Sequence, residues 1–136
     1  MLKTFDKSLR NLKNGSVRVS AVNAQAAPGK ASALLLFANG TRLRADQWRL
    51  IKKGREPISS FDQLEESTSA ANAIGKLNEQ LQDENVNTAT LDRETGDILF
   101  QFSSNIRLQV FNVAGYEAWE INFPDGTFEF STYVFE

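Results

Sequence analysis

Alternating apolar and polar positions predict antiparallel hairpins at two places in the chain. The segment Leu34–Leu43, "LLLFANGTRL", places an Asn-Gly pair between two apolar runs. Asn-Gly favours a two-residue type I′ turn, because both turn positions need a positive φ. The segment Ile98–Phe111, "ILFQFSSNIRLQVF", repeats this layout with Ser-Asn at the turn. Each segment is predicted to form a β-hairpin with a two-residue loop.

A further strand candidate precedes each hairpin and extends it to a three-stranded meander. These candidates are "VRVSAVNA", Val17–Ala24, and "NVNTATLD", Asn85–Asp92. The two units match at a constant offset of 65 residues, in the pairs Leu35 and Phe100, Phe37 and Phe102, Arg42 and Arg107, and Leu43 and Leu108. We predict two similar meanders, with a chance match between two generic hairpins as the alternative.

One amphipathic helix is predicted between the meanders. Ala70, Ile74, Leu77 and Leu81 follow one another at helical spacing, so they form a single apolar stripe. A serine at position 67 or 69 is a suitable N-cap. The predicted helix spans residues 67–84 and covers one face of the sheet.

The stretch "GYEAWEINFPDGTFEFS", residues 115–131, predicts a final hairpin. A two-residue Asp-Gly loop sets Ile121 against Phe130, whereas a three-residue loop sets Ile121 against Glu129. A shift by one residue turns every side chain to the other face, so the apolar pattern favours the two-residue loop. The core face then contains Trp119, Ile121, Phe123, Phe128 and Phe130. The polar face contains Tyr116, Glu120, Asn122, Glu129, Ser131 and Tyr133, while Glu117 falls at a strand end.

Together these elements predict an α+β fold for a single domain over residues 1–136. The antiparallel sheet consists of two three-stranded meanders plus the C-terminal hairpin, with one amphipathic helix packed on it. The first meander covers about residues 17–52, the helix about 67–84, and the second meander with the hairpin about 85–133. A length of 136 residues with 41% hydrophobic content suits one domain with a proper core.

Composition excludes several kinds of chemistry. The chain has no cysteine and no histidine, so it lacks thiolate nucleophiles, disulfides, the commonest general base and the commonest metal ligand. The carboxylates of "LDRETGD", residues 91–97, do not follow the spacing of a calcium loop. We therefore expect no enzyme activity, no metal and no cofactor. No signal peptide or membrane span is apparent, so we expect a cytoplasmic protein without membrane contact.

Charge is strongly divided along the chain. Residues 1–60 hold 12 Lys or Arg and 3 acids, and residues 61–136 hold 3 Lys or Arg and 14 acids. Segregation of this kind predicts binding partners rather than fold. Two interpretations remain open, because the acidic half can form a partner surface or can neutralise the basic half within the molecule.

The strings "WRLIKKGREPISSFD", "GDILFQF", "RLQVFN" and "GYEAWEINFPDGTFEFS" resemble small bacterial proteins encoded beside polymorphic toxins. These are the immunity proteins of contact-dependent growth inhibition systems and related accessory families. The likeness covers about residues 33–133. It implies a non-catalytic protein that binds and neutralises a cognate toxin domain in the cytoplasm. Many such toxins are basic nucleases, which an acidic surface would meet with complementary potential.

The resemblance and the charge pattern together predict the partner-binding residues. Acids and aromatic anchors of the C-terminal hairpin come first, followed by two acids of the preceding turn. The predicted site is Tyr116, Glu117, Glu120, Asp125, Glu129, Tyr133, Asp92 and Asp97. The oligomeric state and the identity of the toxin do not follow from the sequence.

The alternative function is nucleic-acid binding by the basic half. "TRLRADQWRLIKKGR", residues 41–55, combines six cations with Trp48 and imitates a surface that contacts phosphates and stacks a base. The sequence pI near 5.3 argues against it, because an acidic half on a small domain repels a polyanion. Nucleic acid is therefore the less favoured partner. A third hypothesis, acid–base catalysis by paired carboxylates such as Glu120 and Glu129, is less favoured still.

Overall fold

A computed structural model describes residues 2–22, 32–60, 70–113 and 118–131, which together contain two α-helices and ten strands. The described elements are α1 (Leu2–Arg10), β1 (Val17–Val22), β2 (Ser32–Phe37), β3 (Arg42–Ala45), β4 (Trp48–Lys52), β5 (Ile58–Ser59), α2 (Ala70–Leu81), β6 (Val86–Leu91), β7 (Ile98–Phe102), the 3₁₀ turn η2 (Ser103–Asn105), β8 (Ile106–Val110), β9 (Trp119–Asn122) and β10 (Phe128–Phe130).

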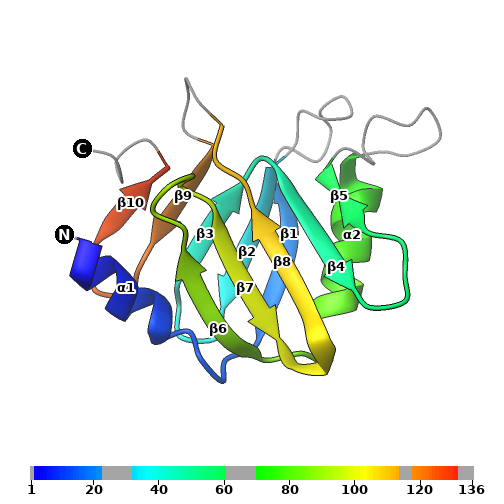
Figure 1. Cartoon of the computed structure of the whole chain (residues 1–136), viewed down its shortest axis with the longest axis horizontal. Coiled ribbons are helices and arrows are strands. Elements are labelled where there is room, and N and C mark those ends of the chain that lie inside the picture. Colours follow the sequence, from blue (N-terminus) through cyan, green and yellow to red (C-terminus); the bar gives the residue numbers. More distant parts are fainter. Residues whose placement is uncertain (1, 23–31, 61–69, 114–117, 132–136) are drawn as a thin grey trace.

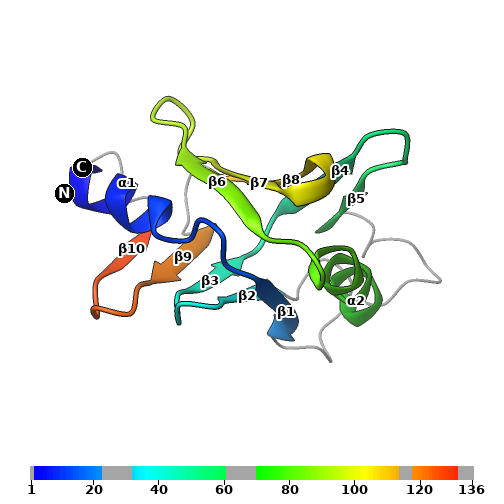
Figure 2. The same cartoon turned by 90° about the horizontal axis from the view of Figure 1, so that it is seen from below.

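The strands form two five-stranded antiparallel sheets that pack face to face. The first sheet has the order β1-β2-β3-β9-β10 and the second the order β6-β7-β8-β4-β5. Phe37 of β2 and Phe100 of β7 stack across the interface with ring centroids 5.4 Å apart. Figure 2 shows the two layers edge-on, with the core between them. The predicted α+β class is confirmed.

The two helices lie at opposite sides of the sandwich, where they fill the openings between the sheets (Figures 1 and 2). Phe5 of α1 contacts Trp119 and Phe123, with ring centroids 5.9 and 5.8 Å away. On the other side, α2 packs on β1 and β5. The side-chain oxygen of Asn78 in α2 accepts a hydrogen bond of 2.7 Å from the backbone N–H of Val19. The helix thus supplies a hydrogen-bond partner for a backbone group of the edge strand β1.

The two sheets are equivalent strand by strand. Leu35 pairs with Leu43 in the first sheet, and their counterparts at an offset of 65 residues, Phe100 and Leu108, pair in the second. The outer hairpins also match, because β9–β10 pairs Glu120 with Phe130 and β4–β5 pairs Arg49 with Ser59, each 71 positions earlier. The sandwich therefore has an internal pseudo-twofold arrangement.

Two strands from each half of the chain, β4–β5 and β9–β10, cross into the sheet of the other half. Trp119 of β9 pairs with Ala45 of β3, and Trp48 of β4 pairs with Val110 of β8. The backbone bonds beside these pairs correspond as well, from Asp46 N to Ala118 O at 3.0 Å and from Phe111 N to Gln47 O at 2.9 Å. The basic and acidic halves are thus interleaved rather than placed side by side.

Two sequence expectations about the helices need correction. The structure contains a second helix, α1, whereas the sequence predicted one helix. Phe5 and Leu9 of α1, together with Leu12 just after it, form a buried apolar stripe that packs this helix on the core. The described part of α2 spans Ala70–Leu81, whereas the prediction ran from 67 to 84. The proposed N-cap serines at 67 and 69 lie outside the described residues.

The predicted two-residue hairpin loops are wrong. Arg42 pairs with Leu36, Arg107 pairs with Gln101, and Glu129 pairs with Ile121, so each loop has three residues. The register shift moves Phe128 and Phe130 to the outside and turns Glu129 and Ser131 inward. Phe128 is accordingly exposed and Ser131 is buried.

The local cause is the same in the β2–β3 and β9–β10 hairpins. In "FANGT" and "FPDGT" the glycine donates a backbone bond to the phenylalanine carbonyl three residues earlier, with N···O distances of 2.9 and 3.0 Å. Gly40 and Gly126 then adopt φ values of 97° and 89°. This is a type I turn closed by a left-handed glycine, and Pro124 occupies the turn position that proline favours.

Candidate functional site

The acids predicted on the final hairpin lie in three different surroundings. Glu120 is on the outer face of the first sheet, Asp125 is in the β9–β10 loop, and Glu129 faces the opposite way, across from Ile121. Tyr116, Glu117 and Tyr133 lie outside the described residues. The hairpin therefore does not collect Glu120, Asp125 and Glu129 on one surface.

Asp92 and Asp97 belong to the β6–β7 turn of the second sheet, where they shape the backbone. One carboxylate oxygen of Asp92 accepts bonds from the N–H groups of Glu94 and Thr95 at 2.8 and 3.3 Å. Asp97 accepts a bond of 2.7 Å from the N–H of Asn112. Both carboxylates are thus engaged in local structure.

Glu120 is partly neutralised by a cation from the other half of the chain. Its Oε2 lies 3.7 Å from Nη2 of Arg44, whose Nη1 lies 2.5 Å from Oδ1 of Asp46. Ser32 donates a further hydrogen bond of 2.5 Å to the same oxygen of Asp46. The guanidinium therefore sits between two acids.

The remaining two acids of the hairpin have shifted pKa values. Hydrogen bonds from Thr127, first from its hydroxyl and then from its N–H, lower the pKa of Asp125. Burial of the carboxyl raises the pKa of Glu129, because the charged form loses solvation. Asp125 therefore stabilises its own loop, whereas ionised Glu129 is disfavoured by its surroundings.

The outer face of the first sheet was missed as a site by the sequence analysis. Its outward side chains form two cross-strand rows, as the strand registers and the alternating burial show. One row is Arg18, Leu36, Arg42, Asn122 and Phe128. The other row is Ser20, Leu34, Arg44, Glu120 and Phe130.

This face carries exposed apolar groups. Phe128 and Val22 are 40% and 38% exposed, and among the described residues they are the only large hydrophobic side chains in the exposed class. The ring of Phe128 packs edge-on against Phe130, with centroids 4.5 Å apart. A hollow of about 260 Å³ lies between Val22 and the hairpin, lined also by Leu34, Arg42, Arg44, Glu120 and Asn122.

The comparisons with known proteins give no relative. No family model, curated protein or solved structure matches the chain. The functional assignment therefore rests on the residues and their geometry.

Two properties of the described residues bear on the chemistry of the site. Within the described ranges, no group of three or more acids is placed to hold a metal ion. None of the helices seen in those ranges is long and apolar enough to cross a membrane.

The basic segment 41–55 does not form the single surface that its sequence imitates. Trp48 is fully buried, so its ring is not available to stack on a base. Arg42 and Arg44 are on the outer face of the first sheet, whereas Arg49 is on the outer face of the second, paired with Gln109. No local pattern predicts this division, because it arises when β4 crosses between the sheets.

Proposed function

We propose that this protein is a non-catalytic binding protein that sequesters a toxin domain in the cytoplasm, as immunity proteins do, and that it binds through the outer face of the first sheet. The observation that carries the proposal is that the two exposed large hydrophobic side chains among the described residues, Val22 and Phe128, both lie on this one face, on its opposite edge strands. Phe128 forms a contiguous apolar group with Phe130, and apolar groups rimmed by polar ones mark protein-interaction sites.

The aromatic pair supplies the anchor that a protein interface needs. A few aromatic and arginine side chains usually contribute most of the binding free energy. Phe128 and Phe130 meet edge to face, which fixes both rings before a partner arrives. Pre-ordered rings lose little conformational entropy on binding, so this part of the face suits a stable complex.

The charges on the face indicate what the partner presents. Arg44 is already paired with Asp46 and Glu120. Arg18 and Arg42, on either side of Leu36, are exposed and form no ion pair within the described ranges. We therefore expect a partner with an apolar centre and flanking carboxylates, rather than the basic nuclease surface that the sequence analysis predicted.

The second sheet provides a comparison within the same molecule. Its outer face has Gln101 at the position equivalent to Leu36, and Ser59 at the position equivalent to Phe130. At these two positions the scaffold therefore carries polar groups on the second sheet and apolar groups on the first. Folding alone does not require Leu36 and Phe130 to be apolar, which supports a binding role for them.

Titration calorimetry with the toxin domain tests this proposal. The partner to use is the C-terminal domain of a large secreted protein, if the adjacent gene encodes one. We expect a one-to-one complex that Phe128→Ser weakens by about 30-fold, since loss of a hot-spot side chain costs about 2 kcal/mol. Arg42→Glu should weaken it by a similar factor.

The matched control is Leu99→Ser, at the position equivalent to Leu34 on the second sheet, which should bind as wild type does. No association of the two wild-type proteins would overturn the immunity role. Unchanged affinity of a folded Phe128→Ser protein would overturn the choice of face.

A further inference from the structure

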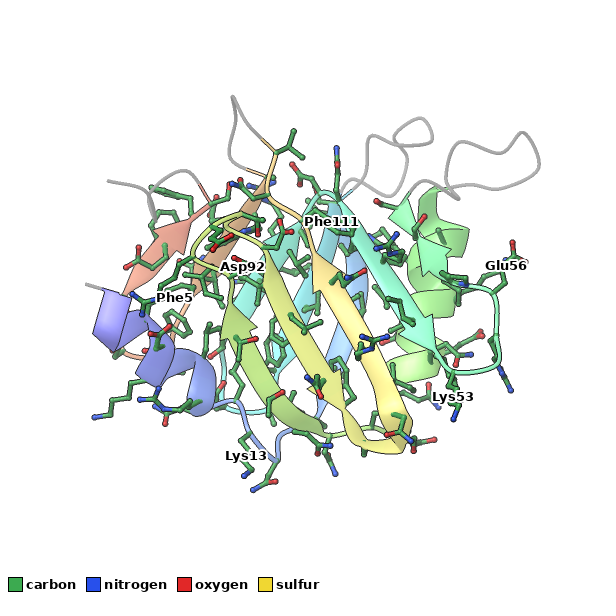
Figure 3. The ribbon with its side chains drawn as sticks, viewed as in Figure 1. Phe5, Lys13, Lys53, Glu56, Asp92 and Phe111 are labelled. Atoms are coloured by element: carbon green, nitrogen blue, oxygen red, sulfur yellow. The ribbon has the colours of Figure 1, made fainter. Side chains whose placement is uncertain are left out.

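The outer face of the second sheet carries cations that lack acidic partners. Arg49 of β4 and Arg107 of β8 point outward from neighbouring strands, and Lys53 and Arg55 lie on the turn that follows β4. Figure 3 labels Lys53 in this turn. Within the described ranges none of these four residues is within ion-pair distance of a carboxylate. The turn after β4 also contains one acid, Glu56, which is not within ion-pair distance of these four cations.

The pseudo-twofold equivalence shows what has changed between the two faces. On the first sheet, Arg44 is flanked by Asp46 and Glu120, which neutralise it. On the second sheet, the positions equivalent to these three residues hold Gln109, Phe111 and Arg49, respectively. Both acids are absent, and a cation and an aromatic ring stand in their places.

Arg49 is held in a defined position on this face. Its Nε donates a hydrogen bond of 2.7 Å to the side-chain oxygen of Gln109. Its guanidinium carbon lies 5.4 Å from the centre of the Phe111 ring. The Nη1 and Nη2 groups have no hydrogen-bond partner among the described residues. They are therefore oriented donors for an anionic oxygen.

We propose that this face binds single-stranded nucleic acid, independently of the toxin-binding role proposed above. Arg49, Arg107, Lys53 and Arg55 neutralise phosphates, and the guanidinium–ring pair of Arg49 and Phe111 forms a planar platform for a base. The neighbouring amide and hydroxyl groups, in rows across the sheet, can bond to base edges and sugars. They are Gln101, Gln109, Thr88 and Thr90.

The chemistry of the face favours nucleic acid over an acidic protein. No large hydrophobic side chain is in the exposed class on the described part of this face, whereas protein interfaces depend on such anchors. An aromatic ring beside a group of cations is the arrangement that binds single strands by stacking, so the single-stranded form fits better. Asp92 and Asp97 share a hollow with Thr90 and Gln109 and lie toward the opposite end of the sheet from Lys53, so we expect the phosphate contacts toward Arg107, Lys53 and Arg55 (Figure 3).

Fluorescence anisotropy with labelled dT₁₂ and U₁₂ tests the proposal on the full chain. We expect dissociation constants of about 10–100 μM near 50 mM salt, weakening as salt increases. The variant Arg49→Gln/Arg107→Gln should lose about 10-fold in affinity. Its salt slope should fall by about 1.4, since each lost phosphate contact on a single strand contributes about 0.7.

The variant Arg18→Gln/Arg42→Gln is the matched control, because it removes two arginines from the outer face of the first sheet and has the same net charge. It should bind dT₁₂ within about twofold of wild type. Absence of binding at 20 mM salt would overturn the proposal, as would an equal loss in both double variants. Competition by poly-glutamate as effective as that by dT₁₂ would do so too, and would indicate an acidic protein ligand. Toxin affinity should be unchanged in Arg49→Gln/Arg107→Gln, which separates this test from that of the proposed function.

Discussion

Trp48 and Trp119 begin equivalent strands, 71 positions apart, and each strand lies in the sheet built mostly by the other half of the chain. Both indole rings are fully buried between the sheets. They differ in one bond, because the indole N–H of Trp119 donates to the carbonyl of Gly96 at 2.8 Å, whereas that of Trp48 has no partner among the described residues. The bond ties the β6–β7 turn to the first sheet.

This difference predicts unequal costs for the same substitution at the two positions. Trp119→Phe and Trp48→Phe leave similar cavities, but only Trp119→Phe also breaks a buried hydrogen bond. An unsatisfied buried carbonyl costs about 1–3 kcal/mol, so Trp119→Phe should lower the unfolding free energy by about that much more. Urea denaturation of both variants measures the difference. Equal costs would show that the indole bond contributes nothing.

Two glycines in different backbone conformations predict opposite effects when each is replaced by alanine. Gly126→Ala places a side chain at a φ of 89°, which costs about 1–2 kcal/mol. Gly75→Ala, on the exposed surface of α2 with no atom within 4 Å of the added carbon, should raise stability by about 0.5–1 kcal/mol. Thermal denaturation compares the two. A destabilising Gly75→Ala or a neutral Gly126→Ala would contradict the backbone assignments.

The pKa of Glu129 predicts a pH-dependent stability effect. Burial raises this pKa in the folded state above its unfolded value, so the folded protein becomes less stable as pH rises through that window. Glu129→Gln removes the penalty, and its unfolding free energy relative to wild type should be higher at pH 7 than at pH 4. Urea denaturation at the two pH values measures this.

Asp125→Asn is the control with the opposite sign. Hydrogen bonds from Thr127 lower the pKa of Asp125, so the stability contributed by its carboxylate is present at pH 7 and is lost as pH falls through the folded pKa. Asp125→Asn should therefore be less stable than wild type at pH 7, and the difference should shrink in acid. The same sign of pH dependence in both variants would contradict the two assigned environments.

The contact between α2 and β1 predicts a cost for losing Asn78. Its side-chain oxygen is the acceptor for the N–H of Val19, on a strand whose other edge pairs with β2. Asn78→Ala should lower the unfolding free energy by about 1–2 kcal/mol, because the N–H loses its partner in a partly buried place. Asn122→Ala, on the open face of the first sheet, should change it by less than about 0.5 kcal/mol. Similar small effects in both variants would show that water replaces the bond.

Local signals in the sequence predicted the fold class and the positions of most strands. Apolar runs around the "ANG" and "PDG" turns fall in β2, β3, β9 and β10, and the stripe of Ile74 and Leu77 falls in α2. The predicted register is wrong because the apolar pattern favoured a two-residue loop, whereas the turn residues favour a three-residue loop. Pro124 before Asp125-Gly126 is a signal for the longer loop, and using it would have placed Phe128 outside.

The candidate site was less predictable than the fold. Pairing of β3 with β9 and of β4 with β8 joins residues 54–80 positions apart, and no periodicity within a segment encodes it. Charge segregation along the chain therefore suggested an acidic surface, whereas strand exchange places Glu120 beside Arg44. The aromatic pair of Phe128 and Phe130 was assigned to the core because the predicted loop was one residue too short.

Amide chemical-shift mapping on addition of the toxin domain tests the central claim most directly. We predict the largest shifts along β3, β9 and β10, around Arg42, Asn122 and Phe128, with little change around Arg49 and Arg107 on the second sheet. Shifts centred on the β6–β7 turn at Asp92, or spread over the second sheet, would contradict the claim that the outer face of the first sheet is the binding surface.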